Sequence, residues 1–429
     1  MKNKFIVFFV LVLIVILIIL KSSIKKDNNS LIIGTANPGQ ITIFNSNENS
    51  QKIIKIIDSG YKFVYSVRIG DIYNNGKKYI IAGVSNSFYA DPYGCKVLAY
   101  DTLGLKESLI DDVGDLRCKD LTIGDADNDG KNEIILATHG EGLVRMYKWV
   151  DGKWQKTDLD RNYIGQNDRK EKSNHRVPNE QLPCQTCIIQ TAVHIVKIAD
   201  IDGDGKNEVI TTQSSPQELR DKEEVSFINI YRKKGSGWER ETVDSLKDRE
   251  FRSIAIGDVY NNGAKTLVIG VGSPRNEKGS LYSYSYQNGQ WKKSVIYDDP
   301  NERNMKGLDI GDVYGDGKQR ILLATGYPKA NIILLSWNGK EFENEKIGSI
   351  SDLFNNPEAE YNSLVAIIDK KNPKQLFIGG MLNFPKEKIG WEASDKGYVV
   401  KYAKNEKDEW TPTIIEDNKN ILGMDLEAN

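Results

Sequence analysis

The sequence predicts an all-β protein, a seven-bladed β-propeller preceded by an N-terminal transmembrane helix. Two observations predict the propeller: a strand-turn-strand segment recurs six times through the chain, and the two chain ends carry complementary parts of one further repeat. An apolar run close to the N-terminus predicts the helix. We therefore expect a signal anchor and tether over residues 1–30 and the propeller over residues 31–429.

The recurring segment consists of an apolar strand, an Asp, a short polar turn and a second apolar strand, as in LTIGDADNDGKNEIILAT from Leu121. The first Asp residues of the six copies lie 54 to 75 residues apart: Asp71, Asp125, Asp200, Asp258, Asp312 and Asp369. An aromatic hairpin follows most copies, as in MYKWVDGKW ending at Trp154, so each period holds about four short strands and no helix. Four antiparallel strands per repeat are typical of a propeller blade. A series of unrelated hairpins, or a sandwich with a second domain, would not explain the period.

The chain ends predict how the ring closes. Residues 31–58 resemble the last three strands of a blade, and ILGMDLEAN from Ile421 resembles the missing first strand. We expect the C-terminal strand to complete the blade that begins at Leu31, which gives seven blades. An insertion of about residues 155–192 interrupts the period.

The N-terminal run covers residues 5–20, 16 apolar residues with lysines on both sides. As a helix it spans roughly 24 Å, slightly less than a bilayer core. We expect an uncleaved, single-pass signal anchor, because no clear small-x-small cleavage site follows it; a cleaved secretory signal is the alternative. The flanking lysines leave the orientation open. We expect the propeller outside the cytoplasm, with a cytoplasm-facing scaffold as the alternative.

Composition and charge exclude several classes of protein. With 39% hydrophobic and 28% charged residues, the chain is neither disordered nor a multi-span membrane protein. The formal charge is -2, and without residues 1–30 the chain keeps 53 basic and 59 acidic residues, a charge of -6. We expect no nucleic-acid partner, because such a body has no bulk attraction for phosphates.

Two of the six turns, DADNDGKNE from Asp125 and DIDGDGKNE from Asp200, carry acids at positions 1, 3, 5 and 9 and glycine at position 6. Carboxylates on alternate residues of a tight loop converge on one point, and the carbonyl of position 7 can add a ligand. Six or seven hard oxygens in a flexible loop suit Ca²⁺ better than Mg²⁺. A solvated turn without metal is the alternative. The candidate metal ligands are Asp125, Asp127, Asp129, Lys131, Glu133, Asp200, Asp202, Asp204, Lys206 and Glu208.

These loops resemble the FG-GAP or VCBS repeats, the calcium-loop propeller repeats of integrin α-subunits and many microbial surface proteins. The resemblance implies calcium between strands one and two of a blade. Three other copies depart from the pattern, with Tyr73, Tyr260 and Tyr314 at position 3. We therefore expect two calcium ions, with the other turns closed by hydrogen bonds from the loop backbone to their own Asp.

Four cysteines in an exported chain favour disulfides. Cys95 precedes a third strand and Cys118 starts the next blade, so both fall on the face opposite the acidic turns and can pair. Cys184 and Cys187 form a CxxC in the insertion. Free thiols, or half a zinc site with His175, remain alternatives.

Residues near the start of the innermost strands are expected to ring the channel mouth on that opposite face. A basic ring on an acidic protein can select an anionic ligand such as an acidic glycan. The alternative is that these long cations cap strand ends and face water. The candidate ligand-binding residues are Tyr65, Lys119, His194, Arg252 and Lys306.

No nucleophile motif, phosphate loop or paired-carboxylate signature stands out, so we name no catalytic residue. We expect a non-catalytic binding, adhesion or assembly module whose partner is an unidentified protein or an anionic glycan. The alternative is a carbohydrate-active enzyme of the polysaccharide lyase kind, which rests on analogy between folds alone.

Overall fold

The computed structural model describes residues 30–45, 53–86, 94–101, 107–114, 116–140, 142–161, 191–214, 225–247, 249–272, 278–355, 359–372, 374–383, 396–417 and 420–426. The predicted membrane segment, residues 5–20, lies outside these residues, as do Cys184 and Cys187. Within the described ranges, no helix combines the length and the apolar character needed to cross a bilayer.

Most of the chain forms antiparallel meanders of four strands, in which each strand pairs with the next. The first two are β6 (Arg117–Gly124), β7 (Glu133–Gly140), β8 (Val144–Val150) and β9 (Lys153–Asp160), then β10 (Thr191–Ala199), β11 (Glu208–Ser214), β12 (Val225–Lys234) and β13 (Gly237–Lys247). The next two are β14 (Glu250–Gly257), β15 (Thr266–Gly272), β16 (Gly279–Gln287) and β17 (Gln290–Asp299), then β18 (Asn304–Gly311), β19 (Arg320–Gly326), β20 (Asn331–Trp337) and β21 (Phe342–Ser349). The last is β22 (Glu360–Ile368), β23 (Gln375–Asn383), β24 (Gly397–Lys404) and β25 (Trp410–Glu416).

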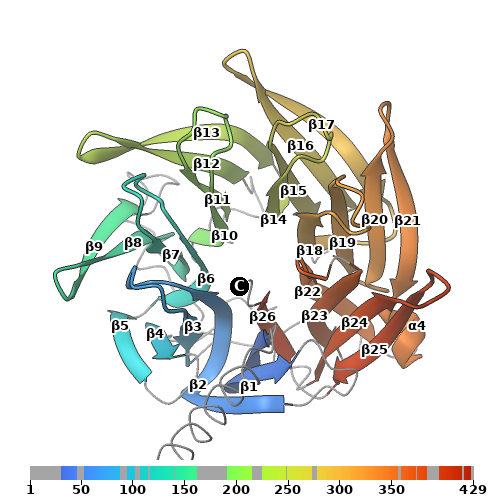
Figure 1. Cartoon of the computed structure of the whole chain (residues 1–429), viewed down its shortest axis with the longest axis horizontal. Helices are drawn as coiled ribbons and strands as arrows, with labels where there is room; N and C mark the ends of the chain where they lie inside the picture. The colour runs from blue at the N-terminus through green and yellow to red at the C-terminus, as the bar shows by residue number, and fades with distance from the viewer. Residues whose placement is uncertain are drawn as a thin grey trace, which may run out of the picture.

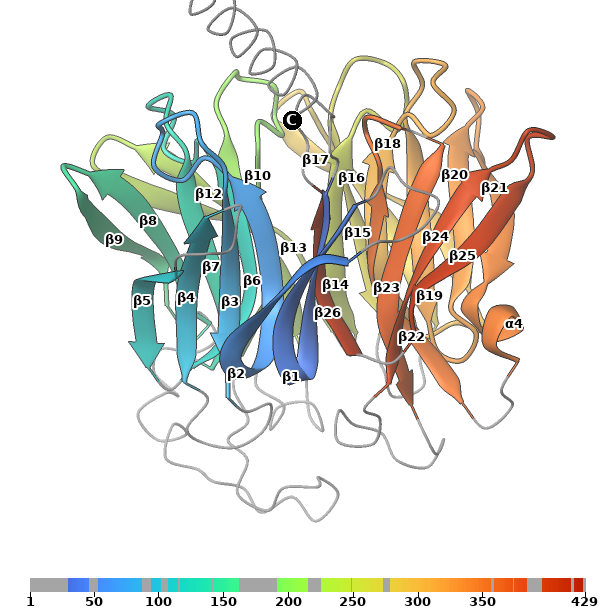
Figure 2. The same ribbon diagram turned by 60° about the horizontal axis from the view of Figure 1, so that its bottom comes forward.

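A sheet of six strands joins the two ends of the chain, in the order β26-β1-β2-β3-β4-β5. Its strands are β26 (Asn420–Leu426), β1 (Ser30–Asn45), β2 (Ile53–Gly70), β3 (Tyr79–Ser85), β4 (Cys95–Asp101) and β5 (Glu107–Gly114). The C-terminal β26 pairs with the start of β1, with Leu31 opposite Leu426 and Gly34 opposite Gly423 (Figure 2). The predicted pairing of the C-terminal strand with the segment that begins at Leu31 is therefore present.

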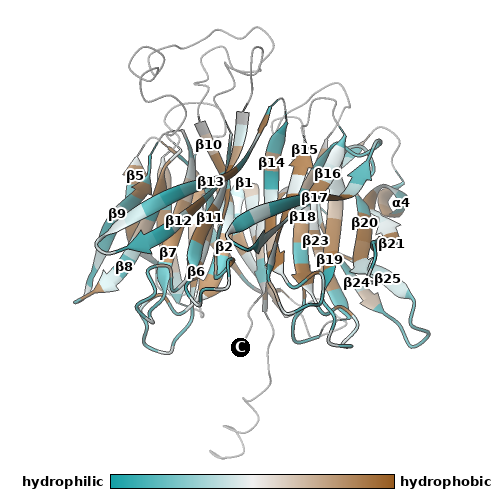
Figure 3. Cartoon of the chain, turned by 90° about the horizontal axis from the view of Figure 1, so that it is seen from above, coloured by the Kyte–Doolittle hydropathy of each residue, from teal (hydrophilic) through white to brown (hydrophobic). Residues whose placement is uncertain are grey.

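The sheets stand around a central channel, with β2, β6, β10, β14, β18, β22 and β26 innermost (Figure 1). Figure 3 colours the outer strands β9, β13 and β17 mainly as hydrophilic, whereas brown hydrophobic residues gather on strands nearer the centre. The burial agrees: every residue of β11 is buried, while β13 alternates between exposed and half-buried residues. Burial between neighbouring sheets thus drives the ring together. That the blades number seven stays a prediction.

Hydrogen bonds between successive turns tie neighbouring sheets together. The Asn128 side chain accepts from the Asn207 amide (2.6 Å) and donates to its carbonyl (3.0 Å). Asn74 makes the same two bonds to the backbone of Asn132, at 2.7 and 3.2 Å. Asn261 accepts from the Gln319 amide at 2.8 Å. We call these contacts the turn latch. Each links position 4 of one turn to position 8 of the next.

Two details differ from the sequence expectations. The predicted insertion starts too early, because residues 153–160 form β9, and β10 begins at Thr191. The outermost strand β9 is mainly polar on both faces, so its sequence lacks the alternating pattern that predicts a strand. One short helix, α4 (Ile350–Phe354), was not expected; Ser349 caps it by accepting from the Asp352 amide.

The turn latch predicts that Asn128→Ala destabilises the protein by about 1–3 kcal/mol beyond the cost of the backbone strain, since two hydrogen bonds are lost. Asn288→Ala is the matched control: Asn288 shares the positive φ (51° against 63°) but lies in the outer turn between β16 and β17. Chemical denaturation of both variants measures the difference. Equal losses of stability would contradict a role for the latch.

Candidate functional site

A β-bulge recurs near the start of each innermost strand. The strand register slips by one residue between Cys118 and Asp120 in β6, and between Phe251 and Ser253 in β14. The same slip occurs in the other innermost strands. A bulge residue has no partner across the ladder, and the bulge re-aims its side chain. The skipped residues are Tyr65, Lys119, His194, Arg252, Lys306, Leu364 and Leu422.

All of these residues, which we call the bulge ring, line one central cavity of about 340 Å³. Five of them are the residues predicted from the sequence to ring the channel mouth. In β22 the bulge residue is Leu364, whereas Ser363 before it is fully buried. A bulge depends on how the register is set along the whole strand, so the strand start alone does not locate it.

The bulge ring is divided into two arcs. Lys119, His194, Arg252 and Lys306 come from consecutive sheets and form a cationic arc. Leu364, Leu422 and Tyr65 complete the circle as an apolar arc, and all three belong to one hydrophobic cluster. Seven basic and four acidic residues line the whole cavity, so positive charge is in excess.

Two lysines of the cationic arc have no carboxylate partner among the described residues. The Lys119 ammonium lies over the Tyr65 ring, 6.0 Å from its centroid. Burial, reinforced by Arg117 and Arg252, lowers the pKa of Lys119 to about 7. Burial and the charges of Arg252 and Lys119 also lower the pKa of Lys306 well below its usual value. An anion entering the cavity would relieve this repulsion.

The other two members of the arc are held by hydrogen bonds and an ion pair. The His194 Nε2 atom lies 2.9 Å from Ser214 Oγ and 4.0 Å from a carboxylate oxygen of Glu250, which also pairs with Arg252. The Nδ1 atom lies 3.3 Å from Nε2 of His139. A catalytic triad needs its acid on the nitrogen opposite the serine. Here both lie on Nε2 and Ser214 is fully buried, so the group is a structural network.

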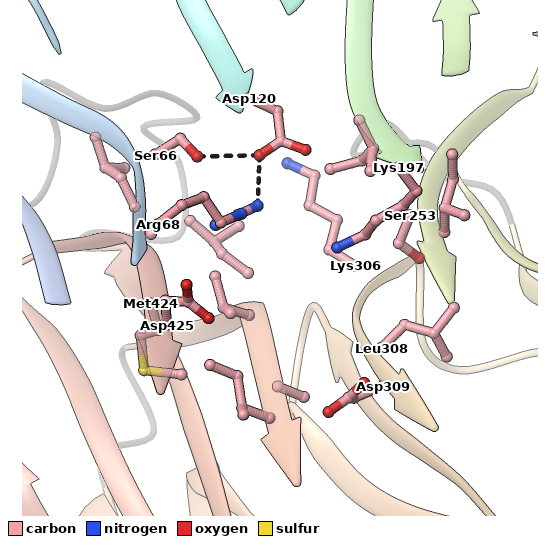
Figure 4. A pocket seen from close by; sticks show the side chains of 18 of the residues that line it. Ser66, Arg68, Asp120, Lys197, Ser253, Lys306, Leu308, Asp309, Met424 and Asp425 are labelled. Atoms are coloured by element: carbon pink, nitrogen blue, oxygen red, sulfur yellow. Dashed lines mark hydrogen bonds and ion pairs between the residues drawn. The ribbon is translucent and has the colours of Figure 1, made fainter. Parts of the chain in front are cut away.

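A second layer of charges lies deeper in the channel, three residues beyond several bulges: Arg68, Lys197, Asp309 and Asp425. Figure 4 shows Arg68 and Ser66 directed at Asp120, at 2.6 and 3.0 Å. Asp309 accepts from the Ile368 amide and Asp425 from the Ile69 amide, each on the next innermost strand. This layer was not predicted from the sequence. The third residue after each predicted channel-mouth residue is the position that identifies it.

A disulfide joins Cys95 to Cys118, so the predicted pairing of these two cysteines is confirmed. Both residues are fully buried. The bond links β4 to β6 directly beside Lys119, and it therefore fixes one side of the bulge ring.

The first acidic loop gathers three of its predicted ligands. Single carboxylate oxygens of Asp125, Asp127 and Glu133 lie within 4.8 Å of one another. Glu133 is fully buried, which raises its pKa to about 7. Two buried oxygens, Asp127 Oδ1 and Glu133 Oε1, have no hydrogen-bond partner. Buried carboxylate oxygens without donors fit a cation, so the donor set of this loop suits Ca²⁺.

The second acidic loop repeats the arrangement with Asp200, Asp202 and Glu208. Burial raises the pKa of Glu208 to about 7. Position 5 lies outside both groups of three. Asp129 and Asp204 accept from the amides of Lys131 and Lys206. The carbonyl oxygens of Lys131 and Lys206 stay predicted ligands.

The turns with tyrosine at position 3 use that side chain in packing between sheets. Tyr73 contacts Trp149 and Trp154 of the next sheet, with ring centroids 4.8 and 5.4 Å apart. Tyr260 contacts Trp337 in the same way at 5.0 Å. In these two turns an aromatic contact takes the place of the carboxylate at position 3.

Comparison with known proteins supports the architecture. No family model matches the chain, and no curated protein matches it. A putative 6-phosphogluconolactonase from Bacteroides fragilis is similar over 94% of this chain and 99% of its own, with a TM-score of 0.55 and 13% identity. A hypothetical selenium-binding protein from Sulfolobus tokodaii aligns over 95% of each chain, with a TM-score of 0.55 and 12% identity. The fold is an all-β propeller. At these identities the likeness extends to the fold alone, and membership of the FG-GAP or VCBS family stays an expectation.

The charge of Lys119 predicts a pH-dependent gain in stability for Lys119→Met. Because the pKa of Lys119 is lowered in the folded protein, the unfolded chain binds more protons than the folded chain between about pH 7 and pH 10.5. The free energy by which this lysine destabilises the fold therefore falls as the pH rises through that range. We expect Lys119→Met to melt above the wild type at pH 6 and level with it near pH 10.5. Thermal melts across this range test it, with Lys153→Met, exposed on β9, as the control. A gain that does not change with pH would contradict the assignment.

Proposed function

We propose that this chain is a non-catalytic binding module, a seven-bladed FG-GAP or VCBS-type propeller whose channel takes an anionic ligand with one apolar face. The division of the bulge ring into a cationic and an apolar arc carries the proposal. An acidic sugar meets both requirements, because its carboxylate can face Lys119 and Lys306 while its C–H face packs on Tyr65. A cavity of about 340 Å³ suits a single small residue of this kind.

The recurrence of the bulge supports the number of blades. Within the described ranges it occurs once in each innermost strand, β26 and β2 included, and these strands number seven. Each blade would then contribute one side chain to the channel mouth.

We further propose that the acidic loops hold two Ca²⁺ ions, through Asp125, Asp127, Asp129 and Glu133 in one loop and the matching acids in the other. The ion would supply charge neutralisation and stiffness to the turns. The two buried oxygens without donors, Asp127 Oδ1 and Glu133 Oε1, support this proposal.

Residues 5–20 would anchor the chain in a membrane, with the propeller outside the cytoplasm. The disulfide between Cys95 and Cys118 supports this placement, because disulfides persist in oxidising compartments. A partner protein on the propeller surface remains part of the proposal, whereas the acidic body gives no reason to propose nucleic acid.

The binding proposal predicts that Lys306→Met weakens binding of acidic oligosaccharides by tenfold or more, which corresponds to about 1.4 kcal/mol. The variant removes the amine of a lysine that has no ion-pair partner among the described residues, and it keeps most of the length of the side chain. A glycan array, followed by titration with an oligogalacturonate, measures the change. Lys153→Met, exposed on β9, is the control and is expected to bind as the wild type does.

Two results would overturn the proposal. Wild-type affinity in both Lys306→Met and Lys119→Met would remove the channel as the binding site. Cleavage of an acidic polysaccharide that Arg252→Ala abolishes would establish the alternative, a carbohydrate-active enzyme.

A further inference from the structure

We infer that Lys148 and Arg232 occupy the centres of the two acidic loops as tethered cations, so that Ca²⁺ binds there only by displacing them. This inference rests on the calcium part of the proposed function, and it adds residues that the loop pattern itself does not contain. In each loop, a side chain of the protein itself would then compete with Ca²⁺ for the same carboxylates.

Lys148, on β8, reaches the first loop from the neighbouring strand. Its ammonium donates to Asp127 Oδ2 at 2.6 Å and to Asp129 Oδ2 at 2.7 Å, and lies 3.6 Å from Glu133 Oε1. The Lys148 ammonium therefore lies among three carboxylates, where a metal ion would be placed.

Arg232, on β12, occupies the second loop in the same way. Its guanidinium donates to Asp202 Oδ2 at 2.9 Å and lies 3.8 Å from Glu208 Oε1. It also pairs with Glu241 on β13. Because Arg232 has this partner outside the loop, we expect it to be harder to displace than Lys148, whose ion-pair partners among the described residues are all loop acids.

Strand pairing explains why the cations stand there. Ile134 pairs with Tyr147, so Glu133, at position 9 of the first loop, lies opposite Lys148. Val209 pairs with Tyr231, so Glu208, at position 9 of the second loop, lies opposite Arg232. In the turn from Asp258, position 9 is Thr266, which is not acidic, and the opposite residue is not basic. Thr266 faces Ser285, with their hydroxyl oxygens 3.4 Å apart.

A third turn also places a side-chain cation beside its acids, here with an arginine from the turn itself. The turn from Asp312 keeps two acids, Asp312 and Asp316, and carries Arg320 at position 9. The Arg320 guanidinium binds both oxygens of Asp316 at 2.6 and 2.8 Å and lies 3.9 Å from Asp312. Thus every described turn with two or more acids holds a side-chain cation, whether it comes from the turn itself or from the third strand.

The test is a pair of measurements on the full chain: thermal melting in chelator and in Ca²⁺, and calorimetric titration with Ca²⁺. Lys148→Met removes the tethered charge and leaves the acids unneutralised. We expect it to melt below the wild type in chelator, to recover in Ca²⁺, and to bind Ca²⁺ at least tenfold more tightly than the wild type. Arg232→Met is expected to act likewise at the second loop. Lys153→Met is the control from the same sheet.

The outcomes separate the inference from the calcium proposal. Equal Ca²⁺ affinities in the wild type and Lys148→Met would overturn the inference and leave the calcium sites standing. A destabilised Lys148→Met that Ca²⁺ does not rescue would support the tethered cation and overturn the calcium sites. If Lys148→Met does not fold, Lys148→Gln, which keeps a hydrogen-bond donor without the charge, provides the same comparison by tryptophan fluorescence.

Discussion

The pairing of β26 with β1 is the contact on which the rest of the structure depends. It joins residues almost four hundred positions apart in the chain, Leu31 and Leu426, within one sheet. Without it the sheet of β1 would lack its innermost strand, and the channel would lose Leu422 and Asp425 from its lining. The main-chain bonds are helped by side chains: Ile421 and Met424 pack with Leu31 and Phe377 in one cluster. Closure therefore combines a ladder with burial across two neighbouring sheets.

Closure of the ring also forms the channel site, because it brings the β-bulges of all innermost strands together around one axis. One β-bulge would merely re-aim one side chain, whereas the same bulge in successive innermost strands directs a ring of side chains at a common axis. The residue at this position differs from strand to strand, which gives the cationic and the apolar arc. The disulfide of Cys118 anchors the neighbouring Lys119. On the other side, the acids of each turn and the cation that they bind belong to a single sheet, whereas the turn latch joins neighbouring turns.

Much of this was predictable from sequence, and the exceptions have physical causes. The period and the complementary chain ends predicted the ring and its closing strand, because each repeat keeps its own pattern of apolar strands. The pairing of Cys95 with Cys118 followed from the expected face of each residue. Leu364 was missed because the position of a bulge is set by the register of the whole strand. Asp309 and Arg68 were missed because the deeper layer depends on how the strands cross the channel. Lys148 and Arg232 were missed because they lie outside the loop motif, 15 and 24 residues after its position 9, and meet it only through strand pairing.

The most direct test of this account is hydrogen exchange at the amides of residues 31–35, in the full chain and in a chain that ends at residue 419. If β26 closes the ring, these amides are protected in the full chain. In the shortened chain they lose protection together with the innermost strands on either side. Unchanged protection after removal of β26 would contradict the closed ring, and with it the channel site.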